Sequence, residues 1–458
     1  MKTAVVGKTA PDNVASSLSP YAAPASRLAY LGEITWVAIA QGAAFLGGLA
    51  TIKVAATVLG PSEYGKLSVG LAVVGIAQVC LYGAISQTAM RFFAFANAHG
   101  LQREYKRALV RLAGTVVALI LSAATVTTVF GLRSLASVPV LILAAYAIIT
   151  GAQMIAVAVC NAARKRDVVG IAQTSEALIR PLLIIVVTYF TVASASHTLL
   201  AYLISTCLVV SIIVALWAMK EGPARGTDRG SLRSNESATS GSLAWTMTTF
   251  AAPFVVFAVL GVIGSHGERL LLAKWTSWSE VGSYALMAQL VMAPNVLFTA
   301  VINQFYFPLV FQFDPSGTHK MARGFRLYLL VSVVGVTAIT AIVALTAAML
   351  IPMFSTRAFL GHEHLLWFLG PSAGLFCIAQ QLVLPGLRLN RPAIYMPAKL
   401  AHSLALLGPS LILVPKWGID GMGVSSLAAS ATYLSAMLLA NAWLRRNPKP
   451  VDSAEAEV

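Results

Sequence analysis

Long runs of apolar residues, separated by short polar connections, follow one another along almost the whole chain. Twelve of these runs centre near residues 45, 78, 120, 149, 178, 208, 257, 295, 338, 375, 404 and 432. A helix needs about 20 apolar residues to cross the hydrocarbon core of a bilayer. Backbone groups in lipid must bond to one another, so the runs predict helices, and the alternating pattern of barrel strands is absent. The predicted fold class is an all-α polytopic membrane protein with twelve transmembrane helices.

The composition excludes a soluble protein. Of the 458 residues, 58% are hydrophobic and only 11% are charged, with a mean hydropathy of +0.78. A soluble domain carries roughly a quarter charged residues, which it needs to cover its surface. The four cysteines lie in apolar stretches without metal-binding spacing, which is typical of small buried hydrophobes. No metal or cofactor site is predicted.

The positive charges gather on one side of the predicted helices. Of the 32 Lys and Arg residues, 23 fall in the tails and even-numbered connections, 5 in the odd-numbered connections and 4 within spans. The positive-inside rule therefore places both termini in the cytoplasm. Most of the net charge of +15 is then an insertion signal, so it does not indicate a nucleic-acid partner.

Two similar segments follow the first and the seventh predicted span. GPSEYG at residues 60–65 and SWSEVG at residues 277–282 share Ser, Glu and Gly when shifted by 217 residues. Together with the helix count, this repeat predicts two parallel six-helix lobes, which normally bind substrate between them near the midplane. The predicted units are a cytoplasmic tail (1–28), the N-lobe (29–220), a cytoplasmic linker (221–240), the C-lobe (241–446) and a second tail (447–458).

Three segments resemble a known family. VLGPSEYGKL at 58–67, GERLLLAK at 267–274 with the following EVG at 280–282, and WGIDGMG at 417–423 are similar to the polysaccharide-biosynthesis branch of the multidrug/oligosaccharidyl-lipid/polysaccharide (MOP) exporter superfamily. The resemblance implies a V-shaped two-lobe transporter. It also implies a flippase that moves undecaprenyl-pyrophosphate-linked oligosaccharide across the inner (cytoplasmic) membrane for O-antigen or exopolysaccharide synthesis.

The implied partners are the lipid-linked oligosaccharide, membrane lipids, a polysaccharide polymerase with chain-length proteins, and H⁺ or Na⁺ as coupling ion. Two other function classes stay open. One is efflux of drugs or organic cations by the same fold, which favours carboxylates in the cavity. The other is a polymerase or ligase enzyme of the same pathway, although the predicted outer loops are short for such chemistry.

The four cations within the spans, together with the amide of Gln173, are the predicted substrate-binding residues. Each cation costs roughly 2.5–3.5 kcal/mol at the centre of a membrane helix, so each requires a partner, water or an anionic ligand. A pyrophosphate-bearing lipid is such an anion. The predicted set comprises Lys53, Gln173, Arg180, Arg269 and Lys399, with Glu176 and Glu268 as ion-coupling or charge-balancing acids.

Each candidate also has a structural interpretation. Gln173, Glu176 and Arg180 share one helical face, where they either line the cavity or form an ion pair at i,i+4. Lys53 and Arg269 lie near the outer ends of their spans, from which a long side chain can also reach the interface. Lys399, one turn before His402, predicts either a secondary site or hydrogen bonding between helices.

Overall fold

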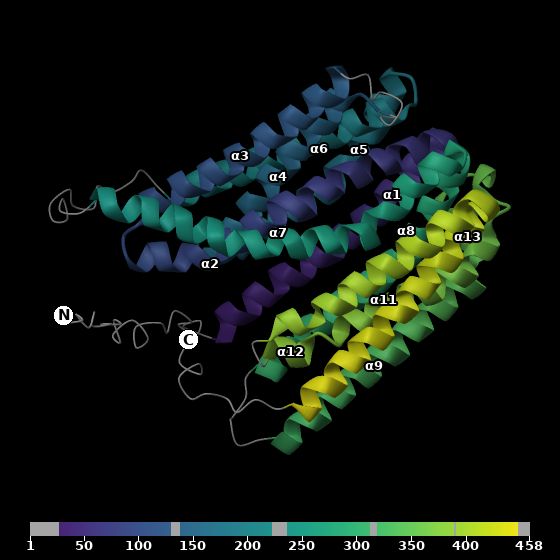
Figure 1. Ribbon diagram of the computed structural model, residues 1–458. Coiled ribbons are helices and arrows are strands. Elements are labelled where there is room, and N and C mark those ends of the chain that lie inside the picture. Colours follow the sequence, from purple (N-terminus) through teal and green to yellow (C-terminus); the bar gives the residue numbers. More distant parts are fainter. Residues whose placement is uncertain (1–26, 130–137, 222–235, 312–317, 389–390, 448–458) are drawn as a thin grey trace, which may run out of the picture.

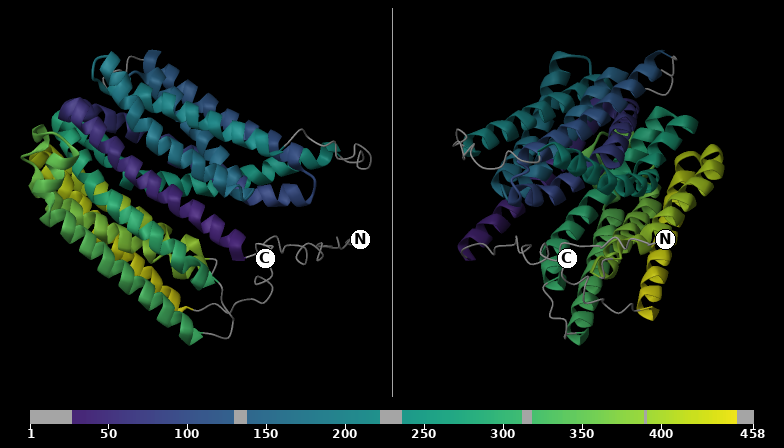
Figure 2. Two further views of the ribbon diagram at one scale, coloured as in Figure 1. Left: turned by 180° about the vertical axis from the view of Figure 1, so that it is seen from behind. Right: turned by 60° about the vertical axis from the view of Figure 1, so that its left-hand side comes forward.

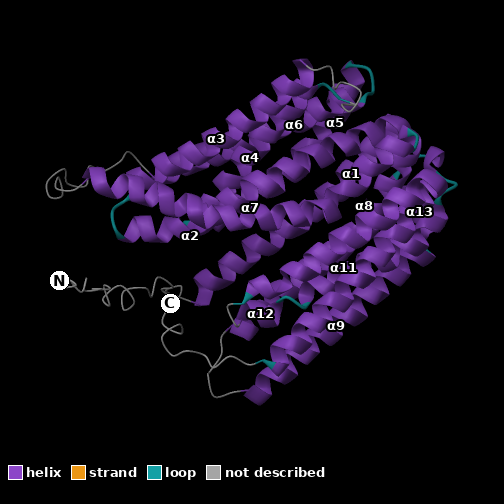
Figure 3. Cartoon of the chain, viewed as in Figure 1, coloured by secondary structure: helices purple, strands orange, loops and turns teal. Residues whose placement is uncertain are grey.

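The computed structural model describes residues 27–129, 138–221, 236–311, 318–388 and 391–447. These residues form helices and connecting turns, with no strand among them (Figure 3). The first half contains α1 (Arg27–Ala77), a π-helical turn (Gln78–Tyr82), α2 (Gly83–Ala98), α3 (Gln102–Val129), α4 (Val140–Ala162), α5 (Arg166–Phe190) and α6 (Ala195–Glu221). The second contains α7 (Glu236–Trp275), α8 (Trp278–Phe311), α9 (Thr318–Leu345), α10 (Ala347–Phe354), α11 (Leu366–Gln381), α12 (Leu384–Arg388) and α13 (Met396–Arg446).

Two glycines divide the two longest helices. Gly60 in α1 has φ 69° and ψ 174°, and Gly418 in α13 has φ 55° and ψ −129°. A glycine adopts positive φ without the steric cost that a Cβ would bring. Each glycine therefore marks a sharp change of direction, and α1 and α13 each consist of two helices in succession.

The helices have the length and composition of membrane spans. Nine segments of the described chain qualify, and two of them, Ile39–Ala98 with 60 residues and Ala393–Arg446 with 54, each contain a glycine break. Both are long enough for two crossings, because one crossing takes about 20 residues. All twelve predicted centres fall inside helices. The total of twelve spans and the cytoplasmic position of both termini stay predictions.

The helices form two bundles arranged as a V (Figures 1 and 2). One bundle contains α2–α6, the other contains α8–α13, and they separate toward the end where the described chain begins and finishes. We call this the open end, and we call the opposite end, where Gly60 and Gly418 lie, the closed end. The two-lobe, all-helical fold class is confirmed.

Helices α1 and α7 lie along the boundary between the bundles. α1 packs against α5 in one bundle and α8 in the other, and α7 packs against α2 and α13. The first half of α7 places Leu243 and Met247 in a core with Ala96, Tyr105 and Ala108 of α2 and α3. α7 begins at Glu236, inside the predicted linker 221–240, whose residues 222–235 lie outside the described ranges.

The largest apolar core joins the two bundles at the closed end. It includes Leu67 of α1, Leu272 of α7 and Leu286 of α8, which are 0–1% exposed. Tyr64 meets Phe359 edge to face, with ring centroids 5.9 Å apart. Because this core crosses the boundary, it joins the two bundles at the closed end.

Candidate functional site

A cavity of about 320 Å³ lies between the two bundles. Its walls come from the first bundle, from α7 and from the second bundle, so it is a site between the lobes. Pockets that bind small molecules typically occupy about 300–1,000 Å³. The lining residues are Val79, Gly83, Ala84, Gln87, Phe254, Ala258, Gly261, Phe376, Gln380, Lys399, His402 and Tyr433.

Lys399 is the single Lys, Arg, Asp or Glu among these lining residues. Its side chain is half-buried, and no acidic side chain shares the wall. The other polar groups are two amides, Gln87 of α2 and Gln380 of α11, together with His402 and the Tyr433 hydroxyl. This charge and this mixture of donors and acceptors suit an anionic ligand that also carries hydroxyl groups.

Three rings from two helices form one face of the cavity. The ring centroids of Phe376 and His402 are 5.4 Å apart, those of Phe376 and Tyr433 are 5.6 Å apart, and those of His402 and Tyr433 are 5.2 Å apart. A Cβ added at Gly264 of α7 would lie 2.5 Å from the His402 ring, so the glycine leaves the space that this ring occupies. Helix packing therefore fixes the position of the ring cluster.

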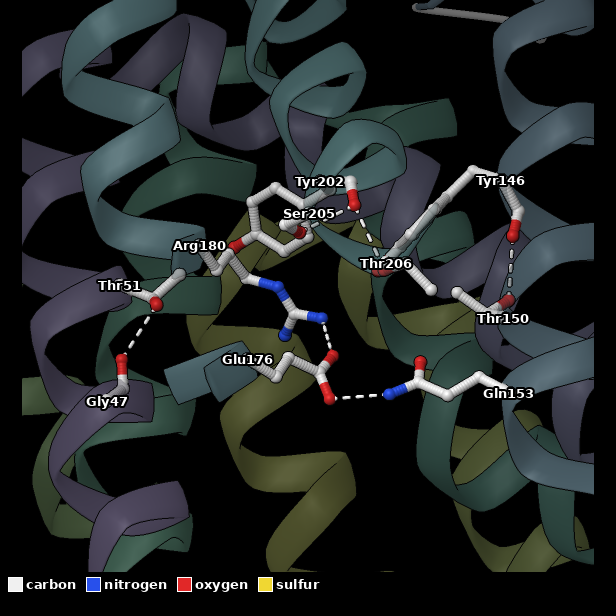
Figure 4. Close-up of polar contacts among 10 residues, drawn as sticks. All are labelled: Gly47, Thr51, Tyr146, Thr150, Gln153, Glu176, Arg180, Tyr202, Ser205 and Thr206. Atoms are coloured by element: carbon white, nitrogen blue, oxygen red, sulfur yellow. Dashed lines mark hydrogen bonds and ion pairs between the residues drawn. The ribbon is translucent and has the colours of Figure 1, made fainter. Parts of the chain in front are cut away.

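The predicted Arg180 site lies elsewhere, inside the first bundle (Figure 4). Arg180 donates to Glu176 one turn earlier on α5, and Gln153 of α4 donates to the other oxygen of that carboxylate at 2.7 Å. The guanidinium also lies over the Tyr202 ring, 4.8 Å from its centroid. The predicted ion pair is thus formed. Gln173, on the same helix, is half-buried and makes no hydrogen bond within the described residues.

Arg269 and Glu268, adjacent on α7, have different surroundings. Both oxygens of the Glu268 carboxylate accept from hydroxyls, from Tyr284 at 2.5 Å and from Ser426 at 2.7 Å. Arg269 is half-buried, and the described residues give its guanidinium no hydrogen bond or ion pair. It lies within electrostatic range of the Tyr64 and Tyr284 hydroxyls, near the boundary between the bundles.

Lys53 is exposed on α1, in a stripe with Leu46, which is 67% exposed. It does not line the cavity. Of the four predicted cations, the structure therefore brings one, Lys399, into the cavity between the bundles, and it places Arg180 in an ion pair with Glu176 within one bundle. For Lys399 the sequence had predicted only a secondary site or hydrogen bonding between helices.

The sequence did not predict the other residues that line the cavity together with Lys399. The sequence offers Gln87, Gln380 and His402 only as polar groups within spans, and Phe376 and Tyr433 look like any membrane aromatic. The spacing of Lys399 and His402 on one helical face was the available signal. Their cavity neighbours come from helices that are distant in sequence, so no local pattern connects them.

The closed end contains a contact between the two repeated segments. A Cβ at Gly65 would lie 2.0 Å from the Trp278 carbonyl oxygen, and a Cβ at Gly282 would lie 1.9 Å from the Pro61 carbonyl oxygen. Both pairs are related by the 217-residue shift, so the contact is symmetric between the lobes. Tyr64 adds a hydrogen bond across the boundary, from its hydroxyl to Gln289 Oε1 at 2.9 Å.

Comparison with known proteins places the chain in a family. No curated protein sequence matches it. Its residues 31–314, more than half of the chain, match the family described as polysaccharide biosynthesis protein. The chain belongs to the polysaccharide biosynthesis protein family.

Solved structures of a flippase and of multidrug transporters share its fold. "Lipid II flippase MurJ, inward closed conformation" has a TM-score of 0.70 at 12% identity, covering 89% of this chain and 87% of that one. An inward-facing multidrug resistance MATE family transporter of the MOP superfamily has a TM-score of 0.63 at 12% identity, covering 91% and 100%. A variant of the Vibrio cholerae MATE transporter VcmN has a TM-score of 0.59 at 14% identity, covering 92% and 99%.

These comparisons confirm the resemblance seen in the sequence. The protein described here is a multi-pass membrane protein of the polysaccharide biosynthesis protein family, and its fold is the one seen in solved MOP-superfamily transporters. At such low identities the structural matches establish the fold alone.

Proposed function

We propose that this protein is a flippase that moves undecaprenyl-pyrophosphate-linked oligosaccharide repeat units across the inner (cytoplasmic) membrane. These units would serve the synthesis of a surface polysaccharide such as O-antigen or exopolysaccharide. The family and the two-lobe fold support a transporter, and the observation that carries the choice of substrate is the cavity wall with Lys399 as its one fixed charge.

The sign of that charge distinguishes anions from cations. A positive group in a site of low dielectric attracts phosphate oxygens more strongly than it would in water. An organic cation would instead meet like charge, since none of the twelve described lining residues is an Asp or Glu. The cavity therefore favours a lipid phosphate over the substrate of a cation exporter.

We also propose roles for the remaining residues of the predicted substrate-binding and charge-balancing sets. Arg269, whose guanidinium has no ion pair within the described residues, supplies a second positive charge near the boundary. Arg180, Gln173 and Lys53 serve as further contacts for the head group as it moves. Glu176 and Glu268 balance these charges or exchange a coupling H⁺ or Na⁺.

Transport would follow alternating access. In this conformation the bundles are joined at the closed end and separate toward the open end, which we place on the cytoplasmic side (Figure 1). The head group enters the cavity while the lipid tail stays in the bilayer. Opening of the closed end then releases the head group on the other side, where a polymerase and its partners would use it. The protein itself catalyses no covalent step in this proposal.

Replacement of Lys399 tests the proposal. Purified protein is reconstituted into vesicles that contain undecaprenyl-pyrophosphate-linked oligosaccharide with a radiolabelled sugar, and transfer is measured with an impermeant glycosidase. Hydrogen bonds to charged groups contribute about 1.5–3 kcal/mol, so Lys399→Met should slow transfer by roughly 10- to 150-fold. Lys399→Arg should keep part of the rate, because the charge remains.

Lys416→Met is the matched control, since Lys416 is exposed on the same helix and does not line the cavity. It should transfer at the wild-type rate. In cells, loss of the gene should stop surface polysaccharide export, and the Lys399→Met variant should fail to restore it. Wild-type vesicles that move organic cations but no lipid-linked oligosaccharide would refute the proposal and favour efflux.

A further inference from the structure

Phe376 packs against the apolar core of the second bundle on one side and lines the cavity on the other. Its ring is half-buried and lines the cavity. His402 and Tyr433, at 8% and 2% exposure, pack against it from α13 at the distances given above. Two nearly buried rings thus hold a third ring in place at the cavity wall.

The polar groups around this ring are placed for hydroxyl groups. Tyr433 donates to Gln380 Oε1 at 3.4 Å, which orients the Gln380 amide. With its oxygen used in this way, the amide NH₂ group still has donors to offer. Gln87 on α2, across the cavity, has an exposed side chain. An aromatic face bordered by amides complements a sugar ring, which has one face of C–H bonds and hydroxyls along its edge.

The positive charge of Lys399, which would bind the phosphate, lies close to the aromatic surface formed by Phe376. Lys399 and His402 are three residues apart on α13, about 4.5 Å along the helix and on the same side. The positive charge and the ring cluster therefore lie about one turn apart. A volume of about 320 Å³ is at the small end of ligand pockets, enough for a phosphate and a neighbouring sugar but not for a whole oligosaccharide.

We propose that Phe376, held by His402 and Tyr433, is a stacking platform for the sugar ring joined to the lipid phosphate. Gln380 lies beside this platform, and Gln87 lies across the cavity from it. This inference rests on the proposed function, because it assigns the sugar part of the same ligand. It adds a second kind of recognition. Lys399 binds the phosphate, which every such lipid carries, whereas Phe376 binds the attached sugar.

The test separates these two kinds of recognition. Dissociation constants are measured in lipid nanodiscs for two probes, undecaprenyl pyrophosphate and undecaprenyl pyrophosphate that carries one N-acetylhexosamine. The wild-type protein should bind the sugar-bearing probe about tenfold more tightly. Phe376→Leu should remove that preference, and Phe376→Trp should keep it because the aromatic face remains. Lys399→Met should weaken the binding of both probes alike.

The chain offers a matched control in the same lobe. Phe325 stacks on Tyr328 with centroids 6.0 Å apart, and Tyr328 donates to Gln381, so this is another Phe–Tyr–Gln group, outside the cavity lining. Phe325→Leu should keep the preference for the sugar-bearing probe. Thermal unfolding of each variant establishes that it is folded.

Three results would overturn the inference. The wild-type protein binds both probes equally, Phe376→Leu keeps the preference, or Phe325→Leu loses it to the same extent. If only the sugar preference is absent while both probes bind, the platform is refuted and the proposed function stands. If the wild-type protein binds neither probe, both are refuted.

Discussion

Addition of one methyl group at Gly282 should open the closed end. The Cβ of an alanine there would lie 1.9 Å from the Pro61 carbonyl oxygen, whereas ordinary contacts begin at 3.4 Å. The contact must therefore widen by about 1.5 Å. Neither helix backbone can rotate away as a side chain would, so the separation has to come from movement of one bundle relative to the other. Overpacking of this kind typically costs about 1–3 kcal/mol.

That cost applies only to the conformation in which the two segments touch. A bias of about 1–3 kcal/mol shifts a two-state equilibrium by about 5- to 150-fold, here toward conformations with a separated closed end. Gly65→Ala should act in the same direction, because its Cβ would lie 2.0 Å from the Trp278 carbonyl oxygen. The double variant should shift the equilibrium by less than the sum, since one separation relieves both contacts.

Distances between spin labels at the closed end measure the shift. Ala193, next to α6, and Ala358, after α10, are exposed residues of the two bundles and suit cysteine substitution in a background without native cysteines. Gly282→Ala should enlarge the long-distance population. Gly114→Ala is the control, because nothing lies within 4 Å of a Cβ at that helical position. An unchanged distance distribution in a folded Gly282→Ala protein, or the same shift in the control, would refute the reasoning.

Two further predictions concern stability, and thermal unfolding of the detergent-purified protein measures both. Arg180→Met should lower the free energy of unfolding by about 3 kcal/mol, the low end for a broken buried pair, because Glu176 and Arg180 keep 20% and 23% of their side-chain area exposed. A double variant with Glu176→Gln should recover part of the loss, and a double variant as unstable as the single one would contradict this. Tyr395→Phe removes a 2.8 Å hydrogen bond to buried Asn441, for an expected loss of about 1–3 kcal/mol, and no measurable loss would show that the bond contributes nothing.

The sequence was sufficient for the helices and their class. Hydropathy identifies a membrane helix locally, because each segment in lipid must satisfy its own backbone hydrogen bonds. For the same reason the twelve predicted centres fall inside helices, and the two lobes predicted with the help of the repeat at residues 60–65 and 277–282 are present in the fold. The ion pair between Glu176 and Arg180 could also be predicted from the sequence, because residues four apart on a helix are neighbours.

The location of the cavity required the folded chain. Lys399 and Arg180 are alike in sequence, as single cations within apolar helices, yet one lies between the lobes and the other in a neutral network inside one lobe. The difference comes from residues on other helices, such as Gln153 beside Glu176 and Phe376 beside His402.

Partners of this kind are set by how helices pack, which depends on contacts between residues far apart in the chain. The composition and the apolar runs thus specified a polytopic helical membrane protein, the repeat predicted its two lobes, and the family resemblance implied a transporter. Which charge meets the cavity, and which glycines join the lobes, followed from the packing of those helices in space.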